Sequence, residues 1–156
     1  MKYGTVLSIQ HDLEEVVNHW ASILPDLEVV SVLRHNEATG GQIGAALAVD
    51  FRLGTQTMSL LQGPPDELTP AVSIEVRTDT QDESDRIYDA LLEGGSEMAC
   101  GWVTDKYGVS WQVSPRELLD LVADPDPARA VAANTAMQQQ KKIDLAPIRA
   151  AVEAAG

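Results

Sequence analysis

The chain has 156 residues and a mass of 16.8 kDa, and its 44% hydrophobic and 22% charged residues argue against disorder. Its 24 Asp and Glu residues outnumber 11 Lys and Arg, giving a formal net charge of −13. A surface this acidic repels phosphate backbones and anionic lipid, so we expect no nucleic-acid partner and no membrane. The single cysteine, Cys100, and the lack of an export signal lead us to expect a cytoplasmic location.

The first 63 residues predict a strand, a helix and three further strands. Apolar and polar residues alternate through residues 5–10, as in a half-buried strand. Asp12 precedes apolar residues that recur every three or four positions from Leu13 to Leu24, which predicts a capped amphipathic helix. Turn residues separate three further strand candidates, which are residues 28–34, 43–52 and 56–62.

The same order of elements starts again near residue 70. A strand is predicted over residues 71–77, and Asp79 or Thr80 then caps a second helix. Short strands are predicted at 97–103 and 109–113, so the second copy is one strand shorter than the first. We therefore predict an α+β fold in which two βαβββ modules, about 1–63 and 70–114, form one curved mixed sheet with helices on its outer face.

Residues 115–156 are predicted to form a helical extension. Ser114, Pro115 and Glu117 have the spacing of a capping box with proline at the first helical position. Asp124–Pro127 ends that helix and begins another that continues to about Lys141. A last helix is predicted from Leu145 to Ala155, and the domain assignment is therefore 1–114 followed by the extension.

Polar side chains on the concave side of the sheet are the candidates for a ligand pocket. Val72, Ile74 and Val76 are predicted to pack against the helices, which leaves the residues between them on the other face. The candidates, taken from the first strand of each module and from the last two strands, are Ser8, Gln10, Ser73, Glu75, Trp102, Trp111 and Gln112. The polar groups could equally contact solvent or a dimer partner, and the two tryptophans could belong to the core.

One segment resembles a known family. Cys100-Gly101-Trp102, followed by Asp105-Lys106-Tyr107-Gly108-Val109 and Trp111, resembles the signature of PhnB-like proteins. These belong to the vicinal oxygen chelate superfamily, with glyoxalase I, bleomycin-resistance proteins and extradiol dioxygenases, and many carry the label demethylubiquinone methyltransferase domain. Residues 71–91, 123–127 and 137–143 are also similar to that family. The resemblance implies paired βαβββ modules, usually assembled as a dimer.

The resemblance also raises the question of a metal. Enzymes of the superfamily bind a divalent ion through His, Gln or Glu, one near the start and one near the end of each module. Here Gly4 and Ala71 stand where a histidine is expected, and Gln112 stands near the end of the last strand. We therefore expect no metal and no cofactor. The alternative is a metal site in which Glu75 and Gln112 are the ligands and His11 moves into the site to join them.

The sequence as a whole favours a metal-independent small-molecule binding protein that forms a homodimer. One alternative is a divalent-metal-dependent enzyme of the superfamily, of the lyase, isomerase or dioxygenase type. Others are the methyltransferase of the family label and a protein-interaction module that uses the acidic surface and the tail. No catalytic residue and no ligand can be named from the sequence.

Overall fold

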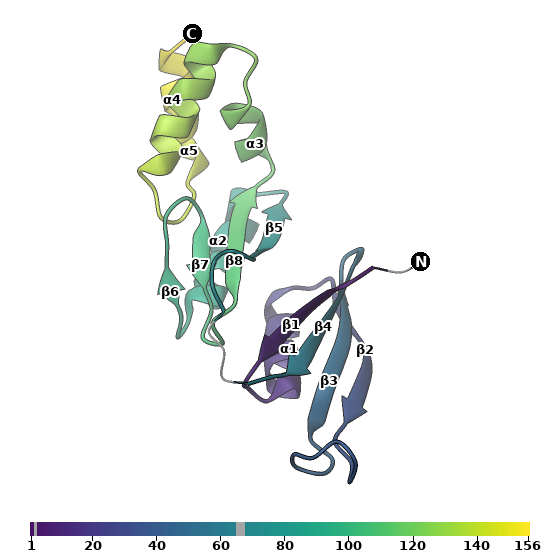
Figure 1. Ribbon diagram of the computed structural model, residues 1–156. Helices are drawn as coiled ribbons and strands as arrows, with labels where there is room; N and C mark the ends of the chain where they lie inside the picture. Colours follow the sequence, from purple (N-terminus) through teal and green to yellow (C-terminus); the bar gives the residue numbers. More distant parts are fainter. Residues whose placement is uncertain (2, 65–67) are drawn as a thin grey trace. The chain divides into compact units, whose positions relative to one another are not determined.

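The computed structural model describes residues 1, 3–64 and 68–156. These residues divide into two compact units, unit 1 (Met1–Leu68) and unit 2 (Thr69–Gly156). Each unit contains a four-stranded mixed sheet, so the α+β class is confirmed, with one sheet for each βαβββ module (Figure 1). None of the described helices has the length and apolar character needed to cross a membrane.

Unit 1 follows the predicted order of one strand, one helix and three strands. Its elements are β1 (Thr5–Ile9), α1 (Leu13–Ile23), β2 (Leu27–Arg34), β3 (Ala46–Leu53) and β4 (Gln56–Gln62). The strand order is β1-β4-β3-β2, and β1 runs parallel to β4. Asp12 caps α1 as predicted, because its carboxylate accepts hydrogen bonds from the backbone N–H groups of Glu14 and Glu15 at 3.0 and 3.1 Å.

Helix α1 covers one face of this sheet. The rings of Trp20 and Phe51 lie with centroids 6.0 Å apart at the centre of the contact, and both side chains are fully buried. The apolar residues of the same core come from the helix and from the helix-facing side of three strands, and they are Leu7, Ile9, Leu13, Val16, Val17, Ile23, Val49, Met58 and Leu60. The other face of the sheet, called here the unit 1 open face, is not covered by a helix from the described residues of unit 1 (Figure 1).

The strand predicted at 43–52 begins later than expected. Residues 36–45 form turns instead, in which the N–H of Ala45 donates to the carbonyl of Gln42 and that of Gly44 donates to the carbonyl of His35. Pairing therefore starts at Ala46, and Ile43 is exposed. The closely spaced glycines in this loop favour turns over continued extended structure, although apolar residues follow them.

Unit 2 repeats the same arrangement. Its first elements are β5 (Ile74–Thr78), α2 (Gln81–Leu92), β6 (Ser96–Glu97), β7 (Trp102–Thr104) and β8 (Ser110–Pro115). The strand order is β5-β8-β7-β6, with β5 parallel to β8. Thr80, rather than Asp79, caps α2, since its hydroxyl accepts a hydrogen bond from the N–H of Glu83 at 3.2 Å. Val72 lies before β5 and is exposed, so the prediction that it packs against a helix is wrong.

The predicted strand 97–103 is in fact a hairpin. Strands β6 and β7 pair antiparallel, and the N–H of Trp102 donates to the carbonyl of Ala99 across a tight turn. The two central residues of the turn, Cys100 and Gly101, both have positive φ, at 60° and 81°. The second module therefore has all four strands, and Cys100 is a turn residue, not a strand residue.

The helical extension packs within unit 2 and consists of α3 (Glu117–Val122), α4 (Pro127–Gln138) and α5 (Leu145–Ala154). Its apolar residues form a separate cluster, which contains Leu118, Ala133, Ile143, Leu145, Ile148 and Val152. The predicted capping box does not form. Ser114 and Pro115 belong to β8, where they pair with Arg77 and Thr78, and α3 begins at Glu117 without a side-chain cap.

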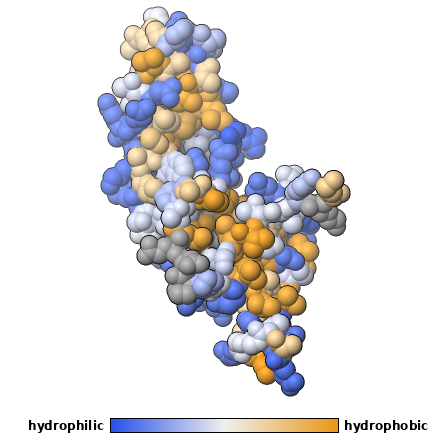
Figure 2. Space-filling model, viewed as in Figure 1, coloured by the Kyte–Doolittle hydropathy of each residue, from blue (hydrophilic) through white to orange (hydrophobic). Residues whose placement is uncertain are grey.

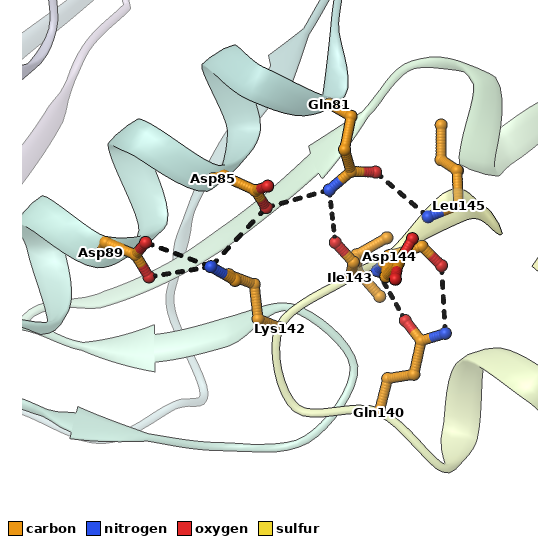
Figure 3. A network of polar contacts seen from close by, with 8 residues as sticks. All are labelled: Gln81, Asp85, Asp89, Gln140, Lys142, Ile143, Asp144 and Leu145. Carbon is orange, nitrogen blue, oxygen red and sulfur yellow. Dashed lines mark hydrogen bonds and ion pairs between the residues drawn. The ribbon is translucent and has the colours of Figure 1, made fainter. Parts of the chain in front are cut away.

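The segment between α4 and α5 attaches the extension to α2 (Figure 3). The amide of Gln81 donates to the carbonyl of Ile143 at 2.7 Å and accepts from the N–H of Leu145 at 3.0 Å. Lys142 forms ion pairs with Asp85 and Asp89 at 3.7 and 3.1 Å. One glutamine thus satisfies two backbone groups next to the start of α5, with a charge pair beside them.

The same segment also contacts the β6–β7 turn. The N–H groups of Cys100 and Gly101 donate to the carbonyls of Gln140 and Lys141 at 2.9 and 2.6 Å. Lys141 forms an ion pair with Glu97 at 2.7 Å. The extension is therefore held to the second sheet by backbone hydrogen bonds as well as by side chains.

An ion pair within the extension predicts an acid-sensitive contact. Arg149 donates from Nε to the carboxylate of Glu117 at 2.6 Å, and this hydrogen bond lowers the pKa of Glu117. A lowered folded-state pKa gives stability that is present at neutral pH and lost as pH falls through that pKa. We expect the coupling between Glu117→Gln and Arg149→Gln, measured by urea unfolding in a double-mutant cycle, to be present at pH 7 and to decrease as the pH falls below 4.5, the ordinary pKa of a glutamate carboxyl. A coupling that stays the same as the solution is acidified would contradict the expectation.

Candidate functional site

Three of the predicted pocket residues lie side by side across the sheet of unit 2. Gln112 on β8 pairs with Glu75 on β5 and with Trp102 on β7. Directly paired residues of neighbouring strands point to the same face of a sheet, so these three side chains form one row, called here the Glu75–Trp102 row. Glu75 is exposed, and the other two are half-buried.

Two contacts orient the polar groups of this row. The amide Nε2 of Gln112 donates to the hydroxyl of Ser73 at 2.7 Å, which fixes the direction of the amide plane. The carboxylate of Glu75 forms an ion pair with Nε of Arg77, two residues along the same strand, at 2.9 Å. The face therefore presents a carboxylate, an oriented amide, a guanidinium and an indole ring within one small area. Such a set can hydrogen-bond and stack a small polar molecule.

Trp111 lies on the opposite face. It pairs with Ile74 and Val103, its side chain is 0% exposed, and its indole Nε1 donates to the buried carboxylate of Asp105 at 2.9 Å. Of the two tryptophans predicted as wall residues, the structure therefore places only Trp102 on the side of Glu75. Trp111 belongs to the core, which was the alternative prediction for the two tryptophans.

The two remaining predicted residues belong to unit 1. Ser8 lies on β1, pairs with Leu61 and is half-buried on the open face. Gln10 follows the end of β1 and is exposed. The seven predicted residues are thus divided, with two in unit 1 and five in unit 2.

Gln10 lines a cavity of about 380 Å³ at the end of the first sheet. The cavity lies where the parallel strands β1 and β4 both end, next to the start of α1 and the loop before β3. Its lining residues are Gln10, His11, Asp12, Leu13, His35, Gly41, Gln42, Ala45, Ala46 and Gln62. The sequence analysis did not identify His35, Gln42 and Gln62 as candidate site residues. The one signal that could have indicated them is that side chains beyond the carboxyl ends of parallel strands converge.

Asp50, on the unit 1 open face, is a further residue that the sequence analysis missed. Its carboxylate accepts hydrogen bonds from the hydroxyls of Ser31 on β2 and Ser59 on β4, at 2.9 and 2.6 Å. The alternation of Asp50 with the buried Val49 and Phe51 was the signal for this position.

The donor groups do not fit a divalent metal. Among residues 1, 3–64 and 68–156, no three His, Cys, Asp or Glu side chains are close enough together to hold an ion. The Glu75–Trp102 row supplies one carboxylate, which already pairs with Arg77, and one neutral amide. Since such ions take four or more ligands in proteins, we derive no step through a metal here.

The fold and these faces define a glyoxalase-like protein, and comparison with known proteins agrees. The model of the 3-demethylubiquinone-9 3-methyltransferase family matches residues 1–114. The chain belongs to this family and is a PhnB-like member of the vicinal oxygen chelate superfamily. A comparison with curated proteins found no match.

Solved structures support the same fold. A PhnB protein from Bacillus cereus, also described as a 3-demethylubiquinone-9 3-methyltransferase, is 29% identical with a TM-score of 0.67, covering 74% of this chain and 99% of its own. The protein PA1353 from Pseudomonas aeruginosa is 18% identical with a TM-score of 0.63, covering 74% and 97%. The fosfomycin resistance protein FosX from Listeria monocytogenes, solved with Mn(II) and sulfate, is 10% identical with a TM-score of 0.50, covering 71% and 88%.

Proposed function

We propose that this PhnB-like protein is a metal-independent small-molecule binding protein. Its ligand lies on the face of the unit 2 sheet that carries the Glu75–Trp102 row. The observation that carries the proposal is the Glu75–Trp102 row, in which a carboxylate, an oriented amide and an indole are paired across three strands. A rigid sheet holds these groups in place before a ligand arrives, which lowers the entropic cost of binding. The expected ligand has a flat apolar part for Trp102 and hydrogen-bonding groups for Glu75 and Gln112.

The methyl transfer named in the family description is not the function that these residues favour. That reaction would need a site for S-adenosylmethionine, and dinucleotide and nucleotide sites commonly use a glycine-rich turn between a strand and a helix. Here the turn after β1 is Gln10–Asp12 and the turn after β5 is Asp79–Thr80, and neither contains glycine. We derive no methyl-transfer step from this arrangement.

The resemblance to PhnB-like proteins supports a homodimer as the working assembly, and we extend the proposal to it. We also propose a cytoplasmic location, because the single cysteine cannot form a disulfide within the chain and a reducing compartment suits such a protein. Sedimentation of the purified chain tests the assembly directly, because a dimer has twice the 16.8 kDa mass of the chain.

The test of binding is a thermal-shift screen of metabolites against four proteins, which are the wild type, Gln112→Leu, Glu75→Gln and Glu93→Gln. A ligand of the proposed site raises the melting temperature of the wild type and loses most of this effect with Gln112→Leu, since the oriented amide is gone. Glu93→Gln is the control for Glu75→Gln, because Glu93 is an exposed glutamate at the end of α2, outside the sheet. A ligand whose effect is equal in the wild type and in both row variants would place binding elsewhere.

Metal analysis tests the metal-independent part separately. The untagged protein is dialysed and then measured with and without added Zn²⁺, Mn²⁺, Ni²⁺ and Fe²⁺. The expected result is no stoichiometric ion and no melting shift with any of the four. A stoichiometric ion that disappears in the Glu75→Ala/Gln112→Ala double variant would overturn metal independence and favour the superfamily's metal-dependent enzymes.

A further inference from the structure

Asp50 is held in a fixed orientation on the unit 1 open face. Residue pairing places Ser31, Asp50, Ser59 and Val6 in one row across all four strands of the sheet. The two serine hydroxyls donate to different oxygens of the carboxylate, at 2.9 Å to Oδ2 and 2.6 Å to Oδ1. Two donors on different oxygens hold the carboxylate in one orientation, so its negative charge points in one direction.

This carboxylate differs from two other acidic side chains of unit 1, each of which has an ion-pair partner. Glu28 pairs with Arg52, and Glu14 on α1 pairs with Arg34 on β2. No cation in the part of the chain that the structure describes forms an ion pair with Asp50. Arg52 is two residues further along β3, but its guanidinium is directed to Glu28. Asp50 is therefore an oriented negative charge that has no ion-pair partner among residues 1, 3–64 and 68 of unit 1.

On the side away from Arg52, the surroundings of Asp50 are largely apolar and open. The neighbouring row contains Leu33, Ala48 and Leu61, and Val6 lies at the end of the row of Asp50 itself. The side chains of Leu33, Leu61 and Val6 are 58%, 39% and 59% exposed, which is high for large apolar residues. Figure 2 shows hydrophobic residues gathered over the sheet of unit 1. A clustered apolar surface of this kind marks a binding site more often than scattered exposed residues do.

We propose that the unit 1 open face binds an organic cation, a protonated amine that carries a short apolar chain. The ammonium N–H groups donate to the carboxylate of Asp50, whose oxygens retain lone pairs beyond those used by Ser31 and Ser59. The apolar chain covers Leu33 and Leu61. An anionic ligand is disfavoured by Asp50 and by the net charge of −13. A bare divalent ion is disfavoured as well, because one carboxylate with two donating hydroxyls cannot supply the six or more oxygen ligands that such ions prefer.

This inference goes beyond the proposed function, because it concerns unit 1 and uses neither Glu75 nor Gln112. The two can fail separately. Loss of the Glu75–Trp102 row is expected to leave amine binding unchanged, and loss of Asp50 is expected to leave the melting shift from a ligand of unit 2 unchanged.

The experiment is an NMR titration of the ¹⁵N-labelled full chain with hexylammonium chloride, with hexanol and sodium hexanoate as matched probes. Hexylammonium is expected to shift the backbone amides of Ser31, Asp50 and Ser59, and its affinity is expected to fall with added NaCl. Asp50→Asn keeps the size of the side chain and removes the charge, so it is expected to weaken binding at least about tenfold. Glu93→Gln is the control, since Glu93 is an exposed glutamate at the end of α2, outside unit 1.

Each other outcome would overturn the proposal. Equal binding of hexanol shows that the face is only an apolar patch, and equal binding of hexylammonium by Asp50→Asn shows that Asp50 is not the counter-charge. Amide shifts confined to other parts of the chain place the amine elsewhere. Thermal unfolding of Asp50→Asn verifies that the variant is folded. Ser59→Ala is a second variant, which removes one of the two hydroxyls that hold the Asp50 carboxylate in place and is expected to bind hexylammonium more weakly.

Discussion

An Asp105→Ala variant is expected to lose roughly 3–5 kcal/mol of unfolding free energy. Asp105 is 3% exposed, and one of its oxygens accepts hydrogen bonds from the N–H groups of Tyr107 and Val109, both at 2.9 Å. The other oxygen accepts from the indole of Trp111, which is fully buried. Alanine removes the carboxylate that accepts from three buried N–H groups, and the turn between β7 and β8 keeps only its backbone hydrogen bonds. Urea unfolding monitored by tryptophan fluorescence measures the loss.

Asp105→Asn and Trp111→Phe provide the matched test of this explanation. Asparagine can still accept from the two backbone N–H groups, but its NH₂ group then faces the indole N–H, so a donor meets a donor. Replacing the indole by phenylalanine removes that conflict. The double variant is therefore expected to be less destabilised than the sum of the two single variants. Additive effects would show that the indole bond does not matter for stability.

Gly101→Val is expected to destabilise the chain by about 2–5 kcal/mol. Gly101 has φ at +81°, and a Cβ at this position would lie 2.6 Å from the carbonyl oxygen of Val113 and 2.9 Å from Cγ1 of Ile143. The first contact is with backbone of β8 and the second is with the buried cluster of the extension. A side chain here therefore strains its own backbone and separates the turn from both neighbours. Thermal and urea unfolding measure the effect.

Gly108 offers a control with the same backbone strain and no clash. Its φ is +84°, and a Cβ there meets nothing within 4 Å. Gly108→Val is therefore expected to show the cost of positive φ alone, and the difference between the two variants gives the cost of the close approach. If both variants lose the same free energy, the contact of Gly101 with Val113 and Ile143 does not contribute.

The sequence predicted those elements whose signals are local. The cap at Asp12 marked the start of α1, and the strand predicted at 56–62 has the bounds of β4. The β6–β7 hairpin was missed because a left-handed conformation at Cys100 is rarely adopted by a residue other than glycine. Ser114 and Pro115 were assigned to a helix because a capping box is a local pattern, whereas their pairing with β5 depends on residues almost forty positions away.

For the candidate site, the periodicity of the strands predicts which side chains share a face, but not which of them are neighbours. Alternation places Glu75 and Gln112 on one face, because side chains of a strand point to opposite faces in turn. It could not supply the register that sets Gln112 between Glu75 and Trp102, nor the contact of Ser73 with the amide. The contacts of Asp50 could not be predicted either, because they depend on the register with two other strands, which supply Ser31 and Ser59.

The contact between the extension and the β6–β7 turn makes two amide protons reporters of its docking. The N–H groups of Cys100 and Gly101 donate to carbonyls of Gln140 and Lys141, and not to any strand of the sheet. Their exchange with deuterium therefore follows the opening of the extension rather than the opening of the sheet. If the helical tail detaches without unfolding of the rest, these two amides exchange faster than their neighbours in β7, and their rates give the free energy of that detachment in the unmodified protein.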